Sequence, residues 1–205
     1  MKIIEASATI ISETPDALSY LERCARTCYN SFDRIAPGSA TRLLVQCRDS
    51  GHLGVFDCAH AGVEFVVDRA IANEIVRHRV GVGYCQESTR YVNYGKKDGG
   101  VAFVAPRFAD AFSAGTWERA MGAAEGNYLE LLKRGEKPEL ARSVLPLSTA
   151  TRLAVAGSFT YWRNFFRKRT NPKAHPQMRV VAVPLLAEFV QRWAPVFGDL
   201  ATVNA

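Results

Sequence analysis

The chain has 205 residues, of which 48% are hydrophobic and 22% charged. This is the composition of a soluble globular protein whose core needs no disulfide staples, and the length favours one domain or at most two small ones. The 26 basic and 20 acidic side chains leave a net charge of +6, which suits an anionic partner such as nucleic acid, a membrane surface or a phosphorylated metabolite.

In chain order, the apolar pattern predicts a mixture of strands and helices. Runs rich in β-branched residues predict strands over 2–11, 59–67 and 149–158. Apolar residues at helical spacing predict helices over 14–28, 39–51, 69–79, 110–134, 138–144, 160–169 and 177–195. Thr14 is the expected cap of the first helix. The polar stretch 93–100 is expected to be a flexible connection. We therefore predict one α+β domain spanning residues 1–205.

The five cysteines favour a reduced, cytoplasmic compartment, because their number is odd and no two of them form a CxxC pair. Cys24 and Cys28 lie four residues apart, but no second pair completes a zinc site, so we expect no metal. The first residues show no cleavage-site pattern, and we find no apolar run of about 18 residues. We therefore expect neither a signal peptide nor a membrane span.

The stretch RHRVGVGYCQESTRY, residues 77–91, follows a helix that Asp68 is expected to cap. We expect Arg77–Arg79 on the last helical turn, before a loop that opens at Gly81 and Gly83. Successive residues on a helix point about 100° apart, so the three basic residues cannot all face one ligand from a regular helix. They suit a multiply charged anion, although cations favour helix C-termini for dipole reasons alone.

Further along this stretch, Ser88 and Arg90 lie two residues apart. In an extended chain they share one side, so a hydroxyl and a guanidinium could bind the same phosphate. A serine hydrolase built on Ser88 and His78 is disfavoured, because no GxSxG elbow surrounds the serine. His52 and Asp57 form a possible general-base pair.

The segment RNFFRKR, residues 163–169, allows two interpretations. Its aromatic residues could stack on nucleic-acid bases while its arginines bind phosphates. Alternatively, the segment is a helix with an aromatic core face and a solvated basic face. A basic nucleic-acid-binding module is therefore one alternative function.

Five blocks, in this order along the chain, resemble those of the flavin-dependent thymidylate synthases. They are ERCARTCYNS, GHLGVFD, RHRVGVGYCQESTRY, ELARSVLPLSTAT and WRNFFRKRTNPKAHPQMR, and the likeness extends over roughly residues 1–190. The resemblance implies an α+β fold with a central, mostly antiparallel sheet flanked by helices. It also implies reductive methylation of dUMP to dTMP, with methylenetetrahydrofolate as carbon donor and FAD reduced by NADPH. A cytoplasmic homotetramer with shared active sites, and no nucleic-acid or membrane partner, is expected.

The resemblance also assigns roles to particular residues. Arg169 is the expected catalytic residue, which contacts and polarises the uracil. The dUMP-binding set is Glu74, Arg77, Glu87, Ser88, Arg90, Arg142 and Arg169. The FAD-binding set is His52, Arg77, His78, Arg79, Glu87, Asn164 and His175.

At several positions the sequence departs from the family pattern. Gly54, Asp57 and Cys58 stand where the family has Ser or Thr, Glu and His, and Ser158–Thr160 replaces an Asn-Ala-Arg block. These changes fall among expected flavin contacts. They motivate a second alternative, a related flavin enzyme that makes a 5-hydroxymethyl pyrimidine nucleotide.

Overall fold

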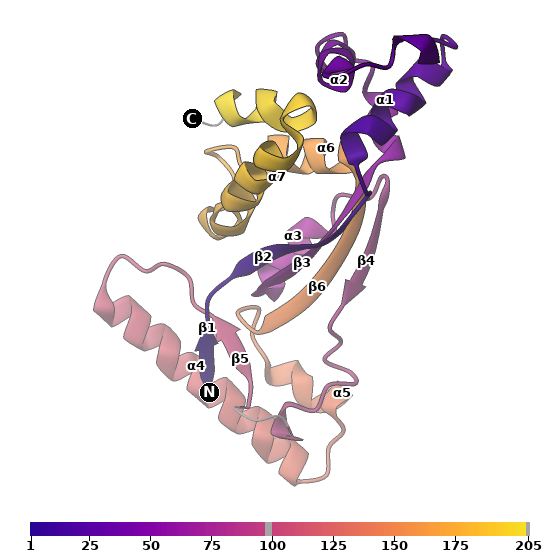
Figure 1. Ribbon diagram of the computed structural model, residues 1–205. Helices are drawn as coiled ribbons and strands as arrows, with labels where there is room; N and C mark the ends of the chain where they lie inside the picture. Colours follow the sequence, from indigo (N-terminus) through magenta and orange to yellow (C-terminus); the bar gives the residue numbers. More distant parts are fainter. Residues whose placement is uncertain (97–99, 204–205) are drawn as a thin grey trace. The chain divides into compact units, whose positions relative to one another are not determined.

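The computed structural model describes residues 1–96 and 100–203, and Figure 1 shows that it combines strands and helices. The strands are β1 (Lys2–Ile4), β2 (Ser7–Glu13), β3 (His60–Asp68), β4 (Val82–Gln86), β5 (Ala102–Val104) and β6 (Ala150–Ser158). The α-helices are α1 (Ala17–Thr27), α2 (Ser39–Asp49), α3 (Arg69–Ile75), α4 (Ala111–Lys133), α5 (Pro138–Ala141), α6 (Phe159–Arg169) and α7 (Pro176–Val203). Short 3-10 helices are η1 (Phe32–Arg34), η2 (Leu53–Cys58), η3 (Tyr94–Lys96) and η4 (Arg142–Val144). Part of the predicted connection over 93–100 lies outside the described residues.

Four strands form one sheet in the order β2-β3-β6-β4, while β1 pairs with β5 in parallel. Backbone hydrogen bonds give the direction of the four strands. The residue after β2 bonds the first residue of β3 at 3.0 Å, and the end of β6 bonds the starts of β3 (Phe159 N to Ala59 O, 2.8 Å) and β4 (Ser158 N to Gly81 O, 3.0 Å). Neighbouring strands therefore run antiparallel, which confirms the predicted α+β fold with a mostly antiparallel sheet and helices.

The chain folds into two compact units. Unit 1 comprises Met1–Ser7, Phe65–Arg77 and Cys85–Leu153, and unit 2 comprises Ala8–Glu64, His78–Tyr84 and Ala154–Ala205. Strands β3, β4 and β6 contribute residues to both units. The expectation that residues 1–205 act as one catalytic domain stays a prediction.

The core of unit 2 is aromatic and is built largely by α6 and α7. Trp162, Phe165 and Phe166 of α6 are fully buried, and the rings of Trp162 and Phe166 lie 5.3 and 5.0 Å from that of Phe189 on α7. Buried rings cannot stack on nucleic-acid bases. Of the two interpretations of residues 163–169, the aromatic core face is therefore correct, but the basic face is not solvated throughout, because Arg163 is buried and its Nη2 lies 2.7 Å from Asp199 Oδ2.

The core of unit 1 forms around α4. Its buried members are Tyr94, Val101, Phe103, Met121, Tyr128 and Ala141. Asp110 starts α4 by accepting a hydrogen bond from Ser113 N at 2.8 Å, as expected of a helix cap. This unit also carries Asp68, the predicted cap of α3, which accepts from Ile71 N at 2.8 Å.

Several predicted boundaries are wrong, and each has a local cause. The predicted strand 2–11 is two strands, β1 and β2, which belong to different sheets. Thr14 does not cap the first helix, because its hydroxyl accepts a hydrogen bond from His60 N at 2.9 Å and so ties the chain to β3. Gly83 lies within β4 rather than in a loop, whereas Gly81 turns the chain with φ of 68°.

Helix α7 is longer than the predicted 177–195 and contains a break. Trp193 has non-helical angles (φ −135°, ψ 49°) two residues before Pro195, and a proline in a helix removes a backbone donor. By length and apolar composition, Pro176–Ala201 would pass for a membrane span, which corrects the statement that no such apolar run exists. Half of its apolar window is buried inside the protein, and this indicates a core helix.

Candidate functional site

The sequence-predicted site residues fall into two groups, one in each unit. The dUMP candidates Glu74, Arg77, Glu87, Ser88, Arg90 and Arg142 belong to unit 1. The candidates His52, His78, Arg79, Asn164, Arg169 and His175 belong to unit 2. The division follows the two expected ligands only in part, because Arg77 and Glu87, expected to bind both dUMP and FAD, lie in unit 1, and Arg169, expected to bind dUMP, lies in unit 2.

In unit 1, residues 88–92 form a tight turn directly after β4. Backbone amides of Tyr91 and Val92 donate to Ser88 O at 3.2 and 3.0 Å, and Arg90 N donates to Ser88 Oγ at 3.3 Å. The Arg90 side chain is exposed, and its guanidinium lies over the Tyr91 ring at 5.3 Å. The structure therefore brings Ser88 and Arg90 together on one preformed turn.

Glu87, at the start of this turn, is held at three points. Its backbone N donates to Arg152 O at 2.9 Å, and its backbone O accepts from Arg69 Nη2 at 2.9 Å. Its carboxylate accepts from the Tyr94 hydroxyl at 2.9 Å. Tyr94 is buried, and burial beside the Glu87 carboxylate raises the pKa of its hydroxyl strongly, so that it stays a hydrogen-bond donor. We call Arg69, Glu87 and Tyr94 the Glu87 clamp.

Arg142 joins the same turn from η4. Its Nη1 donates to Thr89 Oγ1 at 3.1 Å, across 53 residues of sequence. Thr89 is only 7% exposed, so this bond fixes the middle of the turn, while Arg142 itself is exposed. The sequence indicated Arg142 but not the threonine that it contacts.

The basic triplet does not sit on a helical turn, contrary to the prediction. Helix α3 ends at Ile75, and Arg77 N bonds Glu74 O at 3.4 Å in the turn that follows. Two consecutive β-branched residues, Ile75 and Val76, lie at this end, and such residues lower helix propensity. Arg77 and Arg79 are exposed, whereas His78 is half-buried.

In unit 2, His78 and Arg169 form the most direct contact between predicted site residues. Arg169 Nε donates to His78 Nε2 at 2.9 Å. The His78 ring lies edge-on to Phe165 at 5.3 Å and to Tyr161 at 6.2 Å. Burial, together with the nearby Arg169 and Lys168 cations, lowers the pKa of His78 to about 4.

Two tyrosines that the sequence did not single out complete this group. The Tyr84 hydroxyl donates to His78 O and lies 3.2 Å from the Tyr161 hydroxyl. Burial raises the pKa of both phenols. Tyr84 occurs within the quoted motif, but only the fold shows that it turns back towards His78.

Two positions at which the sequence departs from the family pattern contact each other. Ser158 Oγ donates to Asp57 at 2.9 Å and accepts from Tyr161 N at 3.2 Å, as the cap of α6. Thr160 Oγ1 donates to Leu53 O at 3.1 Å. The departures therefore form one hydrogen-bonded joint between η2 and α6, and Asp57 is engaged there rather than with His52.

His52 lines a cavity of about 750 Å³ between α1, α2 and η2. Its polar and aromatic lining includes Arg26, Tyr29, Arg34, Gln46 and His52. Guanidinium groups bind phosphates and aromatic rings stack on flat ligands, and the volume lies in the range of cofactor sites. This cavity can hold a phosphorylated aromatic cofactor.

The remaining unit 2 candidates lie on the surface. Asn164 is exposed on α6, and His175 is exposed before α7, where its Nδ1 accepts from Gln177 N at 3.2 Å. Among the described residues, no group of three or more His, Cys, Asp or Glu side chains could hold a metal ion.

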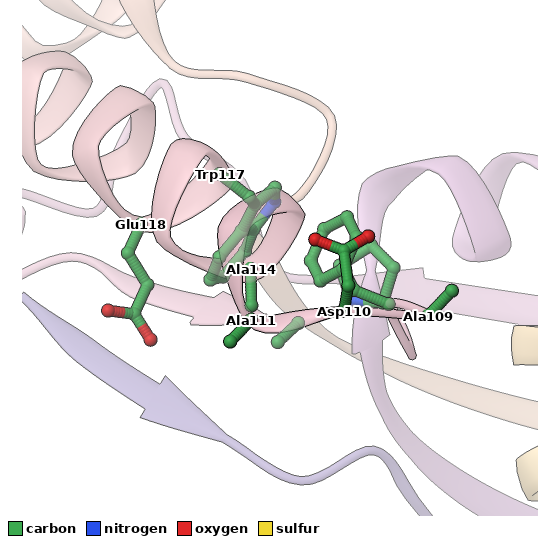
Figure 2. Close-up of a pocket in the computed structure, with 9 residues that line it drawn as sticks. Ala109, Asp110, Ala111, Ala114, Trp117 and Glu118 are labelled. Atoms are coloured by element: carbon green, nitrogen blue, oxygen red, sulfur yellow. The ribbon is translucent and has the colours of Figure 1, made fainter.

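A separate cavity of about 410 Å³ lies at the start of α4 in unit 1 (Figure 2). Figure 2 shows that Trp117, Asp110 and Glu118 are among its walls. Asp110 is already used as the helix cap, and no sequence-predicted site residue lines the cavity. It is therefore distinct from both candidate groups.

Comparisons of the sequence and of the fold with known proteins give consistent results. Residues 9–196 match the family described as "Thymidylate synthase complementing protein". The chain is 32% identical over 203 residues to the flavin-dependent thymidylate synthase of Mycobacterium sp. (strain KMS), covering 87% of this chain and 78% of that one. The enzyme of that name from Mycobacterium tuberculosis (strain ATCC 25177 / H37Ra) is 31% identical over 199 residues, with the same coverage of 87% and 78%. The fold is similar to the crystal structure of the UMP/dUMP methylase PolB from Streptomyces cacaoi bound with 5-Br dUMP, with a TM-score of 0.82, 21% identity, and coverage of 99% of this chain and 97% of that one.

Proposed function

The chain belongs to the flavin-dependent thymidylate synthase family, and from this membership we propose that it methylates dUMP to dTMP. It is a methyltransferase that depends on a flavin. In this proposal the flavin is FAD, NADPH reduces it, and methylenetetrahydrofolate supplies the carbon. The protein is a cytoplasmic homotetramer with shared active sites, and its net charge of +6 suits these anionic ligands.

The observation that carries the proposal is the turn over residues 88–92. Ser88 and Arg90 lie on it together, Arg142 fixes it through Thr89, and Glu87 anchors its start. A hydroxyl beside exposed guanidinium groups is the donor set that a phosphate monoester requires. We assign this turn to the dUMP phosphate. Glu74 in α3 and Arg77 just after it belong to the same proposed dUMP-binding set.

The cavity that His52 lines fits the FAD in chemical terms. Arg34 suits the pyrophosphate, whereas Arg26 is already paired with Glu22 (Nε to Oε1, 2.8 Å), and Tyr29 and His52 carry rings that can stack on an aromatic ring system. When bound, the flavin supplies the hydride chemistry that no side chain of the protein can provide. Arg77, His78, Arg79, Glu87, Asn164 and His175 are the further residues that we assign to its binding on the basis of the family resemblance.

The protein's own residues contribute binding, orientation and charge. Arg169 is the residue that we assign to the uracil, where its cation stabilises negative charge that develops on the ring oxygens. His78 stays neutral at physiological pH because its pKa is lowered to about 4, so it adds no second charge beside Arg169. No cysteine is needed as a nucleophile in this scheme.

The test is tritium release from [5-³H]dUMP by the purified protein with FAD, NADPH and methylenetetrahydrofolate. We expect release that depends on all three additions. Absence of release from a folded, flavin-bound preparation would overturn the proposal. UMP is the matched control substrate, because the structurally similar PolB is described as a UMP/dUMP methylase.

Mass spectrometry of the product checks the group that is transferred. We expect a 5-methyl nucleotide. A 5-hydroxymethyl product would instead support the alternative that the altered Asp57 and Ser158 positions suggested.

A further inference from the structure

The contact between His78 and Arg169 joins two residues that lie 91 positions apart in the sequence. The donor is the Nε–H of the guanidinium, and the acceptor is the imidazole Nε2, at 2.9 Å. A guanidinium can only donate. The His78 Nε2 must therefore carry a lone pair, so the ring is neutral and its proton resides on Nδ1.

The surroundings hold the imidazole in place from several sides. Tyr84 donates to the His78 backbone oxygen, and Phe165 and Tyr161 pack edge-on to the ring. Phe165 is fully buried, and Tyr161 is 4% exposed. A ring fixed in this way presents its Nε2 in one direction, and the direction that it presents is towards Arg169.

We propose that His78 is a positioning residue for Arg169, which orients the guanidinium for the substrate. The inference rests on the proposed function in that Arg169 is the residue assigned to the uracil. It adds to the flavin contact that the family resemblance gave His78. The Nε2 atom is already bonded to Arg169, so only the Nδ1–H group could donate to a cofactor.

The first test compares His78→Phe with His78→Gln. Phenylalanine keeps a ring against Phe165 and Tyr161 but has no acceptor, whereas glutamine restores an acceptor oxygen. We expect His78→Phe to lower kcat about tenfold or more with little change in the KM for dUMP, because a charge-assisted hydrogen bond is lost. His78→Gln should recover part of the loss. Both variants are assayed at saturating FAD, so that a weaker flavin contact does not contribute to the difference in kcat.

A double-mutant cycle with Arg169→Ala sharpens this test. Residues that act as a pair show non-additive effects, so His78→Phe should cost little once Arg169 is gone. Additive losses would overturn the proposal. The proposal would also fail if His78→Phe released flavin and recovered wild-type kcat at saturating FAD, because that pattern defines a cofactor ligand.

The second test does not depend on the reaction. In a spectrum of protein labelled with ¹⁵N in histidine, His78 should show the neutral Nδ1–H tautomer and titrate near pH 4. The charged and titratable groups that face it are Arg169, Lys168, Tyr84 and Tyr161. Removal of the Arg169 cation by Arg169→Gln should raise the His78 pKa. Titration near 6.5 in the wild type would overturn the proposal even if the enzyme proves active, and the expected titration would stand even if the proposed reaction failed.

Discussion

The turn over residues 88–92 of unit 1 and the His78–Arg169 pair of unit 2 are organised differently. The turn over residues 88–92 is built mainly from bonds between near neighbours, and contacts through Glu87 and Thr89 tie it to the rest of unit 1. The pair in unit 2 depends on a single bond between distant segments, supported by aromatic packing. A locally built turn is stable before a ligand arrives, whereas a long-range pair exists only once the fold is complete.

The largest expected effect tests the role of Arg169 in the His78–Arg169 pair. Arg169→Ala should lower kcat by roughly 100-fold or more, because a charge that stabilises the transition state is removed. The affinity for dUMP, measured by isothermal titration calorimetry, should change much less. A larger loss in affinity than in turnover would assign Arg169 to binding alone. Arg167→Ala, an exposed neighbour on α6, is the matched control and should leave both quantities unchanged.

Arg90→Ala should have the next largest effect, and on the opposite parameter. The loss of a charge-assisted phosphate contact is worth about 1.5–3 kcal/mol, so the Kd for dUMP should rise by roughly one to two orders of magnitude. Deoxyuridine, which lacks the phosphate, should bind the wild type and the variant equally. An unchanged Kd for dUMP would show that this turn does not bind the phosphate.

The pH dependence of stability isolates the His78 environment. Above pH 6.5 neither state binds a proton at this ring. As the pH falls from about 6.5 to about 4, His78 binds a proton in the unfolded chain but not in the folded protein. The free energy of unfolding therefore decreases. For a half-buried ring, the loss is about 1–2 kcal/mol after allowance for solvent screening. Urea unfolding at pH 7 and pH 4.5 measures it.

The control for this effect is His78→Gln, which cannot titrate. Its stability should fall less between the two pH values than that of the wild type. Equal losses in both proteins would show that other groups cause the acid sensitivity.

The contrast between local and long-range contacts also explains which features could be predicted from the sequence. The α+β class, the sheet direction and the cap at Asp68 depend on local patterns or on the family resemblance, and the structure agrees with them. Ser88 and Arg90 could be selected from their spacing of two, but the chain over 88–92 is a turn and not the extended segment that the spacing argument assumed. The end of α3 was misjudged because the apolar pattern continues through Val76 while the backbone already turns.

What the sequence could not indicate are contacts that only tertiary structure creates. Arg69 reaches the Glu87 oxygen across 18 residues, and Arg142 reaches Thr89 across 53. No spacing rule connects such pairs. The joint between Asp57 and Ser158, 101 residues apart, shows the same limit: two departures from the family pattern seemed independent in the sequence and prove to be partners.

The smallest expected effect concerns the Glu87 clamp and tests whether the turn is truly preformed. Tyr94→Phe deletes one hydroxyl and leaves the buried ring against Tyr128, whose centroid lies 5.9 Å away. The Glu87 carboxylate loses a bond of 2.9 Å, which is worth about 0.5–1.5 kcal/mol. If that bond only stabilises the fold, the midpoint of urea unfolding falls and the Kd for dUMP stays constant. If it also orders the turn, the Kd rises a few-fold as well. This is the result that we expect, because Glu87 directly precedes Ser88 in the chain.

The control is Tyr20→Phe, a change at an exposed tyrosine of unit 2, which should change neither quantity. A variant with normal affinity and reduced stability would show that the turn holds its shape through Ser88 and Thr89 alone.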